Sequence, residues 1–311
     1  MEKIRIGVLM GGPSAEHDVS LKTGEMILRF LNPNQYAAKG IVISKKGKWP
    51  IPPEKFKKKF DLAFIAMHGE YGEDGTLQSI LDKNRIRYTG SGVKASRLGM
   101  DKAKSLLLFK KNGLDVPKFT VVKGNPTLSE AKMLFGLPLA VKPADRGSSV
   151  GVSIVKKLQE LPEAIKSALK HSQNVMIQEY INGREFTCGV LEINGKLKPL
   201  PPTEIIPRHG RFFDYEAKYL SGMSEEITPP RISQKEIKKI QQAALKAHQA
   251  IGARGMSRTD MIWSDKIYVL EINTIPGMTQ TSLLPQEAKE AGIEFPEMLN
   301  LIVESALNKT R

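Results

Sequence analysis

The hydrophobic and polar positions of this chain begin with an apolar run, a glycine turn and a helical repeat. Lys3 to Leu9 is an apolar run typical of a buried strand, and it leads into the turn Gly11-Gly12-Pro13-Ser14. The spacing of apolar residues then predicts a helix from about Ala15 to Phe30. Further apolar runs predict strands at Lys39 to Ser44 and Leu62 to Met67. A strand, a glycine turn and a helix in succession indicate a doubly wound α/β unit.

Polar residues follow directly after the third predicted strand, in the stretch His68 to Gly75 (HGEYGEDG). Open α/β sheets bind ligands just beyond the carboxyl ends of such strands. The turn after the first strand is not a GxGxxG dinucleotide motif, although the helix N-terminus behind it can hold a negatively charged group. A helix at Thr76 to Asp82 and a short strand at Arg87 to Tyr88 complete a first domain that we expect to end near residue 94.

The middle of the chain predicts a helix around Ser96 to Asn112, followed by strands at Phe119 to Val122, Pro138 to Pro143 and Val152 to Val155. A helix is also predicted at 129–135, between the first two of these strands. A Gly/Ser-rich loop, 144–151, joins the last two strands. Because a Walker A loop joins a strand to a helix, this loop is not one. Its backbone N–H groups suit phosphates, and a plain hairpin turn fits the same pattern.

Two later segments suggest connections with a function. Ile181 to Glu185 lies between the predicted strand Val175 to Tyr180 (VMIQEY) and another strand through Leu191, which suits a hinge between two lobes. A solvated acidic turn explains the same residues. Arg208 to Glu226 is long, polar and aromatic with little periodicity. Loops of that length are usually functional lids or disordered, and the aromatic residues favour a lid.

The C-terminal part predicts a helix capped by Ser233 and running to about Gly252, and a last helix at Phe295 to Asn308. Between them, Arg258 to Leu283 alternates apolar and polar residues around the turn Ser264-Asp265-Lys266, as a β-hairpin does, and ends in a Gly- and Thr-rich exit.

Two carboxylates of this hairpin predict a cation site. With a two-residue loop at Asp265-Lys266, Asp260 lies directly across from Glu271 on the neighbouring strand. Like charges in that position destabilise a sheet, so a divalent cation with hard oxygen ligands would compensate them. The alternative is the solvated polar face of an ordinary hairpin.

Composition narrows the class of protein without identifying it. The chain has 311 residues, 41% of them hydrophobic, which suits a soluble protein of two or three domains. No apolar run approaches membrane-spanning length, and a single cysteine, Cys188, excludes an internal disulfide framework, so we expect a cytoplasmic protein. The net charge of +14 allows either nucleic acid or an anionic small substrate. No nucleic-acid motif accompanies the charge, so we attribute the excess mainly to surface composition together with a polyphosphate site.

Eight blocks of sequence, in order along the whole chain, resemble the D-alanine–D-alanine ligases of the ATP-grasp superfamily. The matching stretches are GGPSAEHDVSL (11–21), AMHGEYGEDGTLQ (66–78), YTGSG (88–92) with MDKAKS (100–105), VKPADRGSSVGVS (141–153), YINGREFTCGVL (180–191), FDYEAKYLSG (213–222), SRTD (257–260) and LEINTIPGMTQTSLLP (270–285). The resemblance implies a doubly wound α/β domain at 1–94 for substrate, followed by a two-lobed ATP-grasp fold, mixed α/β and α+β. Its central lobe would be 95–177 and its C-terminal lobe, with the metal site, 178–311.

The resemblance also implies a reaction. ATP would phosphorylate the carboxylate of a first D-alanine, and the amine of a second D-alanine would attack the acyl phosphate, giving the dipeptide used for peptidoglycan precursors. It implies two Mg²⁺ (or Mn²⁺) ions and a homodimer formed through the first domain, with neither a nucleic-acid nor a membrane partner. It leaves open whether K⁺ is a further cofactor.

Roles near the substrate are carried over residue by residue. Glu16 would receive the ammonium of the first D-alanine, although an acid at a helix start also complements the helix dipole. His68 would lie beside the reacting carboxylate, where a structural histidine is the alternative. Ser148 and Tyr219 would complete a hydrogen-bonded group with Glu16 and close the lid, excluding water. Arg258 and the Gly277 N–H would stabilise the oxyanion, and Ser282 with the Leu283 N–H would bind the second carboxylate.

Further roles concern ATP and metal. The residues matched to phosphate contacts are Lys102, Lys142 and Lys218, with the loop around Ser148. Those matched to adenine and ribose are Gln178, Glu179, Ile181 and Glu185. Many family members have an acid where Gln178 stands, but its carbonyl can still accept from the adenine amino group. Asp260, Glu271 and Asn273 would coordinate the metal ions.

Three alternatives remain at this point. A D-alanine–D-lactate ligase or a related D-amino-acid ligase of the same superfamily is the nearest, but Tyr219 in its EAKY context favours the amine acceptor. A nucleic-acid-binding module would account for the positive charge. An ATP-grasp binding protein without activity is disfavoured because the expected catalytic side chains are all present.

Overall fold

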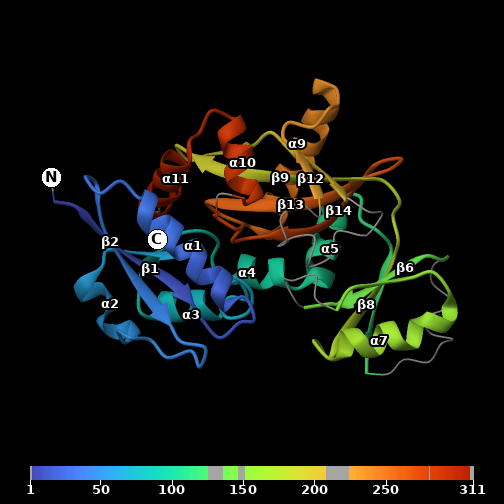
Figure 1. Cartoon of the computed structure of the whole chain (residues 1–311), viewed down its shortest axis with the longest axis horizontal. Helices are drawn as coiled ribbons and strands as arrows, with labels where there is room; N and C mark the ends of the chain where they lie inside the picture. Colours follow the sequence, from blue (N-terminus) through green and yellow to red (C-terminus); the bar gives the residue numbers. More distant parts are fainter. Residues whose placement is uncertain (1, 125–135, 146–150, 208–223, 280, 309–311) are drawn as a thin grey trace.

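A computed structural model describes residues 2–124, 136–145, 151–207, 224–279 and 281–308. Its strands form three sheets, one built from each successive part of the chain (Figure 1). The predicted helix at 129–135 and the centre of the Gly/Ser-rich loop, 146–150, lie outside the described residues, as does most of the predicted lid, 208–223.

The first sheet is the expected parallel α/β unit. Its order is β2 (Tyr36–Ile43), β1 (Ile4–Gly11), β3 (Leu62–Ile65) and β4 (Arg87–Tyr88), and every pairing is parallel. The connections contain helices, as parallel strands require: α1 (His17–Phe30), α2 (Pro53–Lys59) and α3 (Thr76–Lys83). Helix α2 was not predicted. The ring of Phe56, on this helix, packs on Gly7. A Cβ added to Gly7 would lie 2.6 Å from that ring.

Two helices, rather than the single one predicted at 96–112, follow the first sheet. They are α4 (Val93–Met100) and α5 (Lys102–Lys111). Asp101 has an extended backbone and its carboxylate accepts the N–H of Lys104 at 3.0 Å, so it ends one helix and caps the next. An Asp favours this position because its side chain competes for backbone N–H groups.

The second sheet is antiparallel, and one helix of the described residues packs on it. Its order is β5 (Phe119–Lys123), β8 (Asn174–Glu179), β6 (Leu139–Pro143) and β7 (Ser153–Val155). After a 3₁₀ turn at Leu158–Glu160, helix α7 (Leu161–Leu169) packs on it through a small core of its own. The Gly/Ser-rich loop therefore connects two neighbouring antiparallel strands, as expected.

The third sheet has the order β12 (Ser224–Ile227), β11 (Thr203–Pro207), β9 (Arg184–Ile193), β13 (Met256–Trp263) and β14 (Ile267–Asn273), with β10 (Lys196–Pro199) beside β9. Strands β10, β11 and β12 were not predicted; β12 takes up the end of the expected lid. Helix α9 (Gln234–Ile251) packs on this sheet through a shared core. Ser233 caps it, as predicted, and the structure shows that Glu236 completes a capping box.

The hairpin of β13 and β14 has the predicted pairing but not the predicted loop. Asp260 and Glu271 are register partners. The loop, however, contains three residues, because Trp263 pairs with Ile267. An irregularity in the register between Asp260 and Met261 restores the pairing of the two acids.

The last two helices return to the first sheet. Helices α10 (Leu283–Glu290) and α11 (Phe295–Leu307) contribute Leu284, Leu299 and Ile302 to the core that also contains the first sheet's Val8 and Phe64. Helix α10, which was not predicted, begins where the sequence suggested an irregular exit. The two ends of the chain thus lie in one body (Figure 1).

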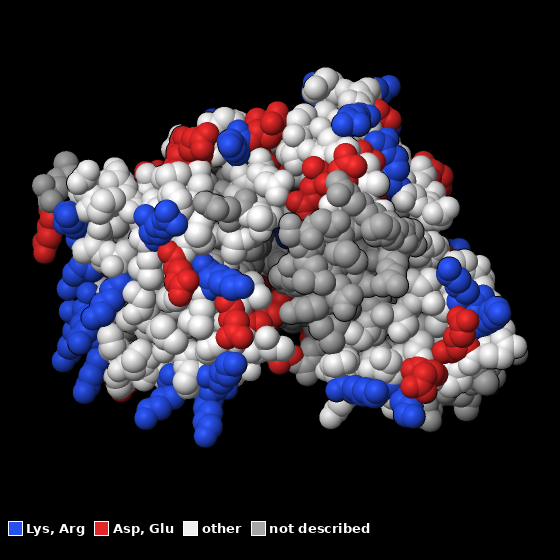
Figure 2. All heavy atoms as spheres, in the orientation of Figure 1, with Lys and Arg blue, Asp and Glu red and all other residues white. Residues whose placement is uncertain are grey.

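Two further features concern the single cysteine and the positively charged side chains. Cys188 is fully buried, and burial raises the pKa of its thiol well above the usual value. Lys and Arg side chains gather over β2 and α2, where Lys57, Lys58 and Lys59 end the helix (Figure 2). Among the described helices, none is long and apolar enough to span a membrane.

Candidate active site

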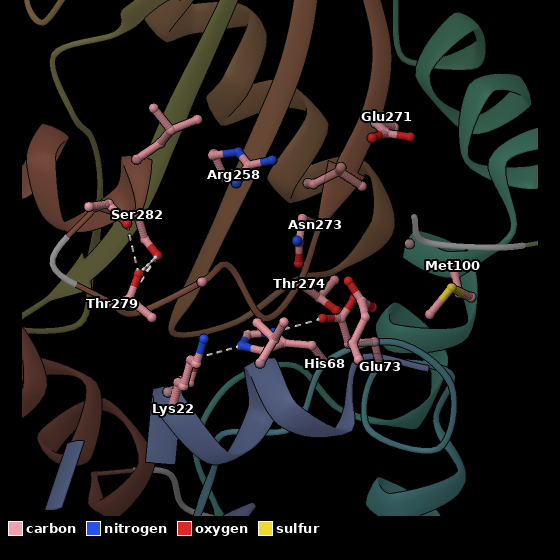
Figure 3. A pocket seen from close by; sticks show the side chains of 18 of the residues that line it. Lys22, His68, Glu73, Met100, Arg258, Glu271, Asn273, Thr274, Thr279 and Ser282 are labelled. Atoms are coloured by element: carbon pink, nitrogen blue, oxygen red, sulfur yellow. Dashed lines mark hydrogen bonds and ion pairs between the residues drawn. The ribbon is translucent and has the colours of Figure 1, made fainter. Parts of the chain in front are cut away.

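A cavity of about 320 Å³ lies where the first sheet, the linking helices and the third sheet meet. Its size is that of a small-ligand pocket. Residues from six segments of the chain line it, and Figure 3 shows many of them from close by. The lining includes nine of the predicted site residues: Glu16, His68, Lys102, Arg258, Glu271, Asn273, Gly277, Ser282 and Leu283.

The third sheet presents two adjacent rows of side chains on one face. Register partners in antiparallel strands share a face, and so do residues two apart. The first row runs through Thr203, Thr187, Asp260 and Glu271. The second row runs through Gly189, Arg258 and Asn273. The hairpin thus presents both acids, the arginine and the amide toward the same side.

Arg258 is the cation of this face. Its Nε and Nη2 donate to the two carboxylate oxygens of Asp260 at 3.0 and 3.1 Å. Burial works to lower the pKa of Arg258, but the charge and hydrogen bonds of Asp260 outweigh it and the pKa is raised. Arg258 was predicted to stabilise an oxyanion only, whereas in the structure it is also the ion-pair partner of Asp260.

Lys102 approaches the same face from α5. The residue is buried, and its Nζ donates to the carboxylate of Glu271. Lys102 was predicted to contact phosphate oxygens and Glu271 to bind metal. Both residues reach one point of the pocket, where the ammonium of Lys102 compensates the charge of the Glu271 carboxylate.

The metal-ligand prediction fits the chemistry of the donors. Asp260, Glu271 and Asn273 offer hard oxygen atoms on one face of the hairpin, which suits Mg²⁺. The Oδ1 of Asn273 accepts the Ile275 N–H at 2.9 Å, which fixes its amide. No group of three or more His, Cys, Asp or Glu side chains gathers as a metal site in the described ranges, so an amide has to complete this set.

His68 is buried beside the pocket, and both of its ring nitrogens make polar contacts. Its Nε2 lies 2.8 Å from the Thr23 hydroxyl, and its Nδ1 lies 3.1 Å from the Ile275 carbonyl and 3.3 Å from Glu73. Burial works to lower the pKa of His68, but the hydrogen bond and charge of Glu73, with the charge of Glu16, raise it. Sequence reasoning missed Glu73, although it lies in the same HGEYGEDG stretch.

Glu16 lies at the N-cap of α1, yet its side chain does not cap the helix. The hydroxyl of Ser14 accepts the Glu16 N–H at 3.1 Å instead. The Glu16 carboxylate lies close to Gly69, and a Cβ at residue 69 would be only 2.7 Å from Glu16 Oε2. The lack of a side chain at Gly69 therefore leaves room for the carboxylate. The alternative of an acid serving only the helix start is therefore weakened, and the carboxylate faces the pocket.

The exit from the hairpin forms one wall of the pocket. Ser282 Oγ accepts the Thr279 N–H at 3.0 Å and lies 2.8 Å from the Thr279 hydroxyl. Ser282 is the N-cap of α10, but its side chain does not cap the helix. An added Cβ on Gly277 would lie 2.8 Å from Ser282 Oγ, so glycine is needed there for a close approach.

The predicted nucleotide residues lie on the second sheet and its connection to the third. Lys142 and Gln178 are buried on β6 and β8, and Glu179 ends β8. Ile181 is half-buried in the connection, and Glu185 is on β9. The buried Nε2 of Gln178 has no hydrogen-bond partner in the described part of the chain. Buried hydrogen-bond donors without a partner are rare in native proteins, so this donor suits a polar group of a ligand.

Three predicted residues, Ser148, Lys218 and Tyr219, lie outside the described residues. Besides Glu73 and Thr23, the pocket contains Lys22 and Glu226, neither of which the sequence analysis identified. For Lys22 a signal was available, because Glu16, Val19 and Lys22 recur every three residues and so follow one side of the predicted helix.

Models of two protein families match most of the chain. The D-Ala–D-Ala ligase N-terminus matches residues 5–58 and 51–91, and the D-Ala–D-Ala ligase C-terminus matches residues 108–304. A D-alanine–D-alanine ligase from Trichlorobacter lovleyi is 42% identical over 313 residues, covering 100% of this chain and 97% of the relative. One from Geobacter sulfurreducens is 40% identical, covering 98% of this chain and 95% of the relative.

Solved structures agree with these matches. The VanG D-Ala:D-Ser ligase from Enterococcus faecalis has a TM-score of 0.87 at 33% identity, covering 98% of this chain and 100% of that one. The D-alanine–D-alanine ligase from Bacillus anthracis complexed with ATP has a TM-score of 0.82 at 32% identity, covering 98% and 97%. The expected fold class, a doubly wound domain followed by a two-lobed ATP-grasp fold, is confirmed.

Proposed function

This chain belongs to the D-alanine–D-alanine ligase family, and on that premise we propose that its pocket joins two D-alanines at the expense of ATP. A carboxylate oxygen of the first D-alanine attacks the γ-phosphorus, the bond to the bridging oxygen breaks, and ADP leaves. The amine nitrogen of the second D-alanine then attacks the acyl carbon. The tetrahedral intermediate loses phosphate, the nitrogen loses a proton, and the dipeptide for peptidoglycan precursors results.

One observation carries the proposal: an acid, a buried histidine, two paired cations and a serine-threonine wall converge on one cavity from distant parts of the sequence. Glu16 supplies a negative charge for an ammonium group, whereas Arg258 and Lys102 supply positive charge for a carboxylate and phosphates. This arrangement suits positioning and electrostatic stabilisation, which dominate catalysis of phosphoryl transfer.

The first D-alanine would bind between Glu16 and His68. The carboxylate of Glu16 receives the ammonium, and Gly69 keeps that carboxylate at the wall of the pocket. His68 lies beside the reacting carboxylate, and the hydrogen bond and charge of Glu73 raise its pKa. A protonated ring would attract the carboxylate before it is phosphorylated.

ATP would bind between the second and third sheets. Gln178, Glu179 and Ile181 surround adenine and Glu185 holds the ribose, an assignment supported by the unpartnered buried amide of Gln178. Lys102 and Lys142 contact the phosphates, as does Lys218. Lys142 is buried at the end of β6, so only a ligand anion or a neighbouring acid can neutralise it without water.

Asp260, Glu271 and Asn273 would hold two Mg²⁺ or Mn²⁺ ions. When bound, the ions supply positive charge at the terminal phosphates of ATP. The chain's own part is to keep the three ligands on one face: Thr187 donates to Asp260 at 2.8 Å, and Asn273 is fixed by the Ile275 N–H. Lys102 and Arg258 balance the two carboxylates when no ion is present.

The second D-alanine would bind at the start of α10. Ser282 and the Leu283 N–H receive its carboxylate, because the first N–H groups of a helix have no partner within the helix. Arg258 and the Gly277 N–H stabilise the oxyanion of the tetrahedral intermediate. Ser148 and Tyr219 complete the group around Glu16 and exclude water from the acyl phosphate.

We further propose the division of the chain into a substrate domain at 1–94, a central lobe at 95–177 and a C-terminal lobe at 178–311, and a homodimer formed through the first. The homodimer is tested by the mass of the protein in solution, measured by light scattering. A mass near that of one chain at micromolar concentration would reject it.

The activity is tested by coupled ADP release with ATP, Mg²⁺ and D-alanine. We expect ADP release that depends on both D-alanine and Mg²⁺. Replacing half of the D-alanine by D-lactate distinguishes the related depsipeptide ligase, because an ester product at neutral pH would favour that reaction. ADP release independent of D-alanine would reject the proposal.

A further inference from the structure

One face of helix α1 follows the pocket for two turns. Glu16, Val19, Lys22 and Thr23 all line the cavity, and their spacing of three, six and seven residues places them on one side of a helix. Glu16 and Lys22 carry opposite charges. The helix thus presents an acid at one end of this face and a base further along it.

Lys22 differs from the other cations of the pocket. Arg258 is paired with Asp260, and Lys102 with Glu271. Lys22 makes no ion pair or hydrogen bond to any residue in the described ranges, and it remains exposed. An ammonium group that lines a cavity without a partner is free to bind an anion there.

The position of Lys22 in the cavity indicates which part of a bound substrate it would contact. In Figure 3, Lys22 extends from α1 into the cavity on the same side as Thr279 and Ser282, whereas Glu271 and Met100 lie on the other side. Ser282 is the N-cap residue of α10, and the N-terminus of this helix carries the positive end of the helix dipole. Pro285 has no N–H, so the amides of Leu283 and Leu284 are the ones that this end offers. Lys22 and the start of α10 therefore add positive charge on the same side of the cavity.

The spacing of Glu16 and Lys22 matches the product. Six residues of an α-helix rise about 9 Å. The charged ends of an extended dipeptide are separated by about 7 Å, since each residue spans about 3.5 Å. The long side chain of Lys22 can cover the remaining difference. An ammonium at Glu16 therefore places the carboxylate of the same dipeptide near Lys22.

We propose that Lys22 binds the carboxylate of the second D-alanine, and hence of the dipeptide product, together with the N-terminus of α10. The inference rests on the proposed function, because it assigns a ligand group to the same pocket. Lys22 is a substrate-binding residue in this account and takes no part in bond making.

A competing explanation is that Lys22 pairs with Glu226, the acid of β12 that also lines the cavity. Glu226 already accepts the Gln286 Nε2 at 3.0 Å. A pairing of Lys22 with Glu226 would affect the stability of the protein and both substrates together. Binding of a carboxylate would instead affect only ligands that carry one.

The test measures calorimetric binding of D-alanyl-D-alanine and of D-alanyl-D-alaninamide, which lacks the carboxylate, to the full chain with ADP and Mg²⁺ present. We expect the wild type to bind the acid more tightly than the amide. Lys22→Gln should weaken binding of the acid about fivefold to tenfold and leave the amide unchanged, the modest size reflecting an exposed ammonium. Lys22→Arg should retain most of the preference, and Arg29→Gln, an exposed charge later on α1, should change neither.

Kinetics give a second measurement. Lys22→Gln should raise the KM for the second D-alanine by a similar factor and leave kcat within about twofold, because uniform binding is lost. Equal affinities of Lys22→Gln and wild type for the acid would overturn the inference, as would an equal loss for acid and amide. If the wild type makes and binds the dipeptide but the variant is unaffected, only Lys22 is excluded. A wild type that neither makes nor binds it overturns the proposed function as well.

Discussion

Asp260 and Glu271 are register partners across β13 and β14, with each carboxylate held by a cation from a different part of the pocket. Arg258 holds Asp260 from the same strand, and Lys102 reaches Glu271 from α5. Two like charges side by side would weaken a hairpin by themselves. The pairing is therefore tolerated because the site supplies compensating charge, first from the chain and then from the metal ions proposed to bind there.

Removal of the charge on Glu271 should abolish activity without unfolding the protein. Glu271→Gln keeps the shape of the side chain and a hydrogen-bond acceptor for Lys102, but it loses the charge of the proposed metal ligand. We expect ADP release in the presence of D-alanine to fall at least about 100-fold. Thermal unfolding should shift by only a few degrees. Glu290→Gln, an exposed acid on α10, is the control; ADP release by Glu271→Gln at the wild-type rate would show that the metal assignment is wrong.

Glu287 should make stability depend on pH. This acid is fully buried on α10 and accepts the Gly189 N–H at 2.6 Å. Burial raises its pKa to about 8, although the charge of Arg258 opposes the shift. Because folding raises the pKa of Glu287, the contribution of this residue to the free energy of unfolding is fully present below the unfolded pKa. That contribution is lost as pH rises through about 8.

Urea unfolding of wild type and Glu287→Gln between pH 5 and pH 9 measures this dependence. The wild type should lose stability relative to the variant as pH rises, by on the order of a few kcal/mol, because the variant has no proton to release. Parallel stability curves for the two proteins across this range would contradict the prediction.

Glu73 should control the protonation of His68. Burial by itself lowers the pKa of His68, and the contact of Nδ1 with Glu73 reverses that effect. Glu73→Gln should therefore lower the pKa of His68, measured by NMR titration of the ring nitrogens. His17→Gln, a change at a neighbouring histidine that bonds the Gly12 carbonyl, serves to assign the signals. An unchanged pKa of His68 in Glu73→Gln would show that another group raises it.

Gly69 and Gly47 offer a matched pair of substitutions to test the proposed site of the first D-alanine. Both have φ +73, so alanine at either residue costs about 1 kcal/mol of backbone strain. A Cβ at Gly69 would lie 2.7 Å from Glu16 Oε2, whereas nothing lies within 4 Å of one at Gly47. Gly69→Ala should raise the KM for the first D-alanine about tenfold or more by displacing the carboxylate. Gly47→Ala should leave it unchanged, and equal KM values in the two variants would remove Glu16 from the binding site.

Local patterns predicted much of the fold. The apolar runs of β1 and β3, the capping box at Ser233 and the alternation in β13 and β14 each depend on near neighbours in sequence, which a single chain displays. The break at Asp101 was missed because Ser96 to Asn112 has helical residues on both sides of it. Strands β10 to β12 were missed because they are short, and because β11 pairs with β9 and with β12 across long stretches of sequence.

The site was predicted unevenly for the same reason. The resemblance named Glu16, Glu271 and Ser282, and the structure brings them to one pocket. The resemblance could not show that Lys102 contacts Glu271, because these residues are 169 positions apart in the sequence. Contacts of that kind depend on how α5 packs on the hairpin. Glu287 was not identified because an acid within a helical stretch is usually solvated, and only packing reveals that this one is buried.

The most direct test of the account measures ADP and dipeptide from the same reaction. Purified protein, ATP, Mg²⁺ and D-alanine are incubated, ADP is measured by a coupled assay, and D-alanyl-D-alanine is quantified by mass spectrometry. The account predicts one dipeptide per ADP, with neither product formed when D-alanine is omitted. ADP formed without dipeptide, or no ADP above the level without D-alanine, would contradict it.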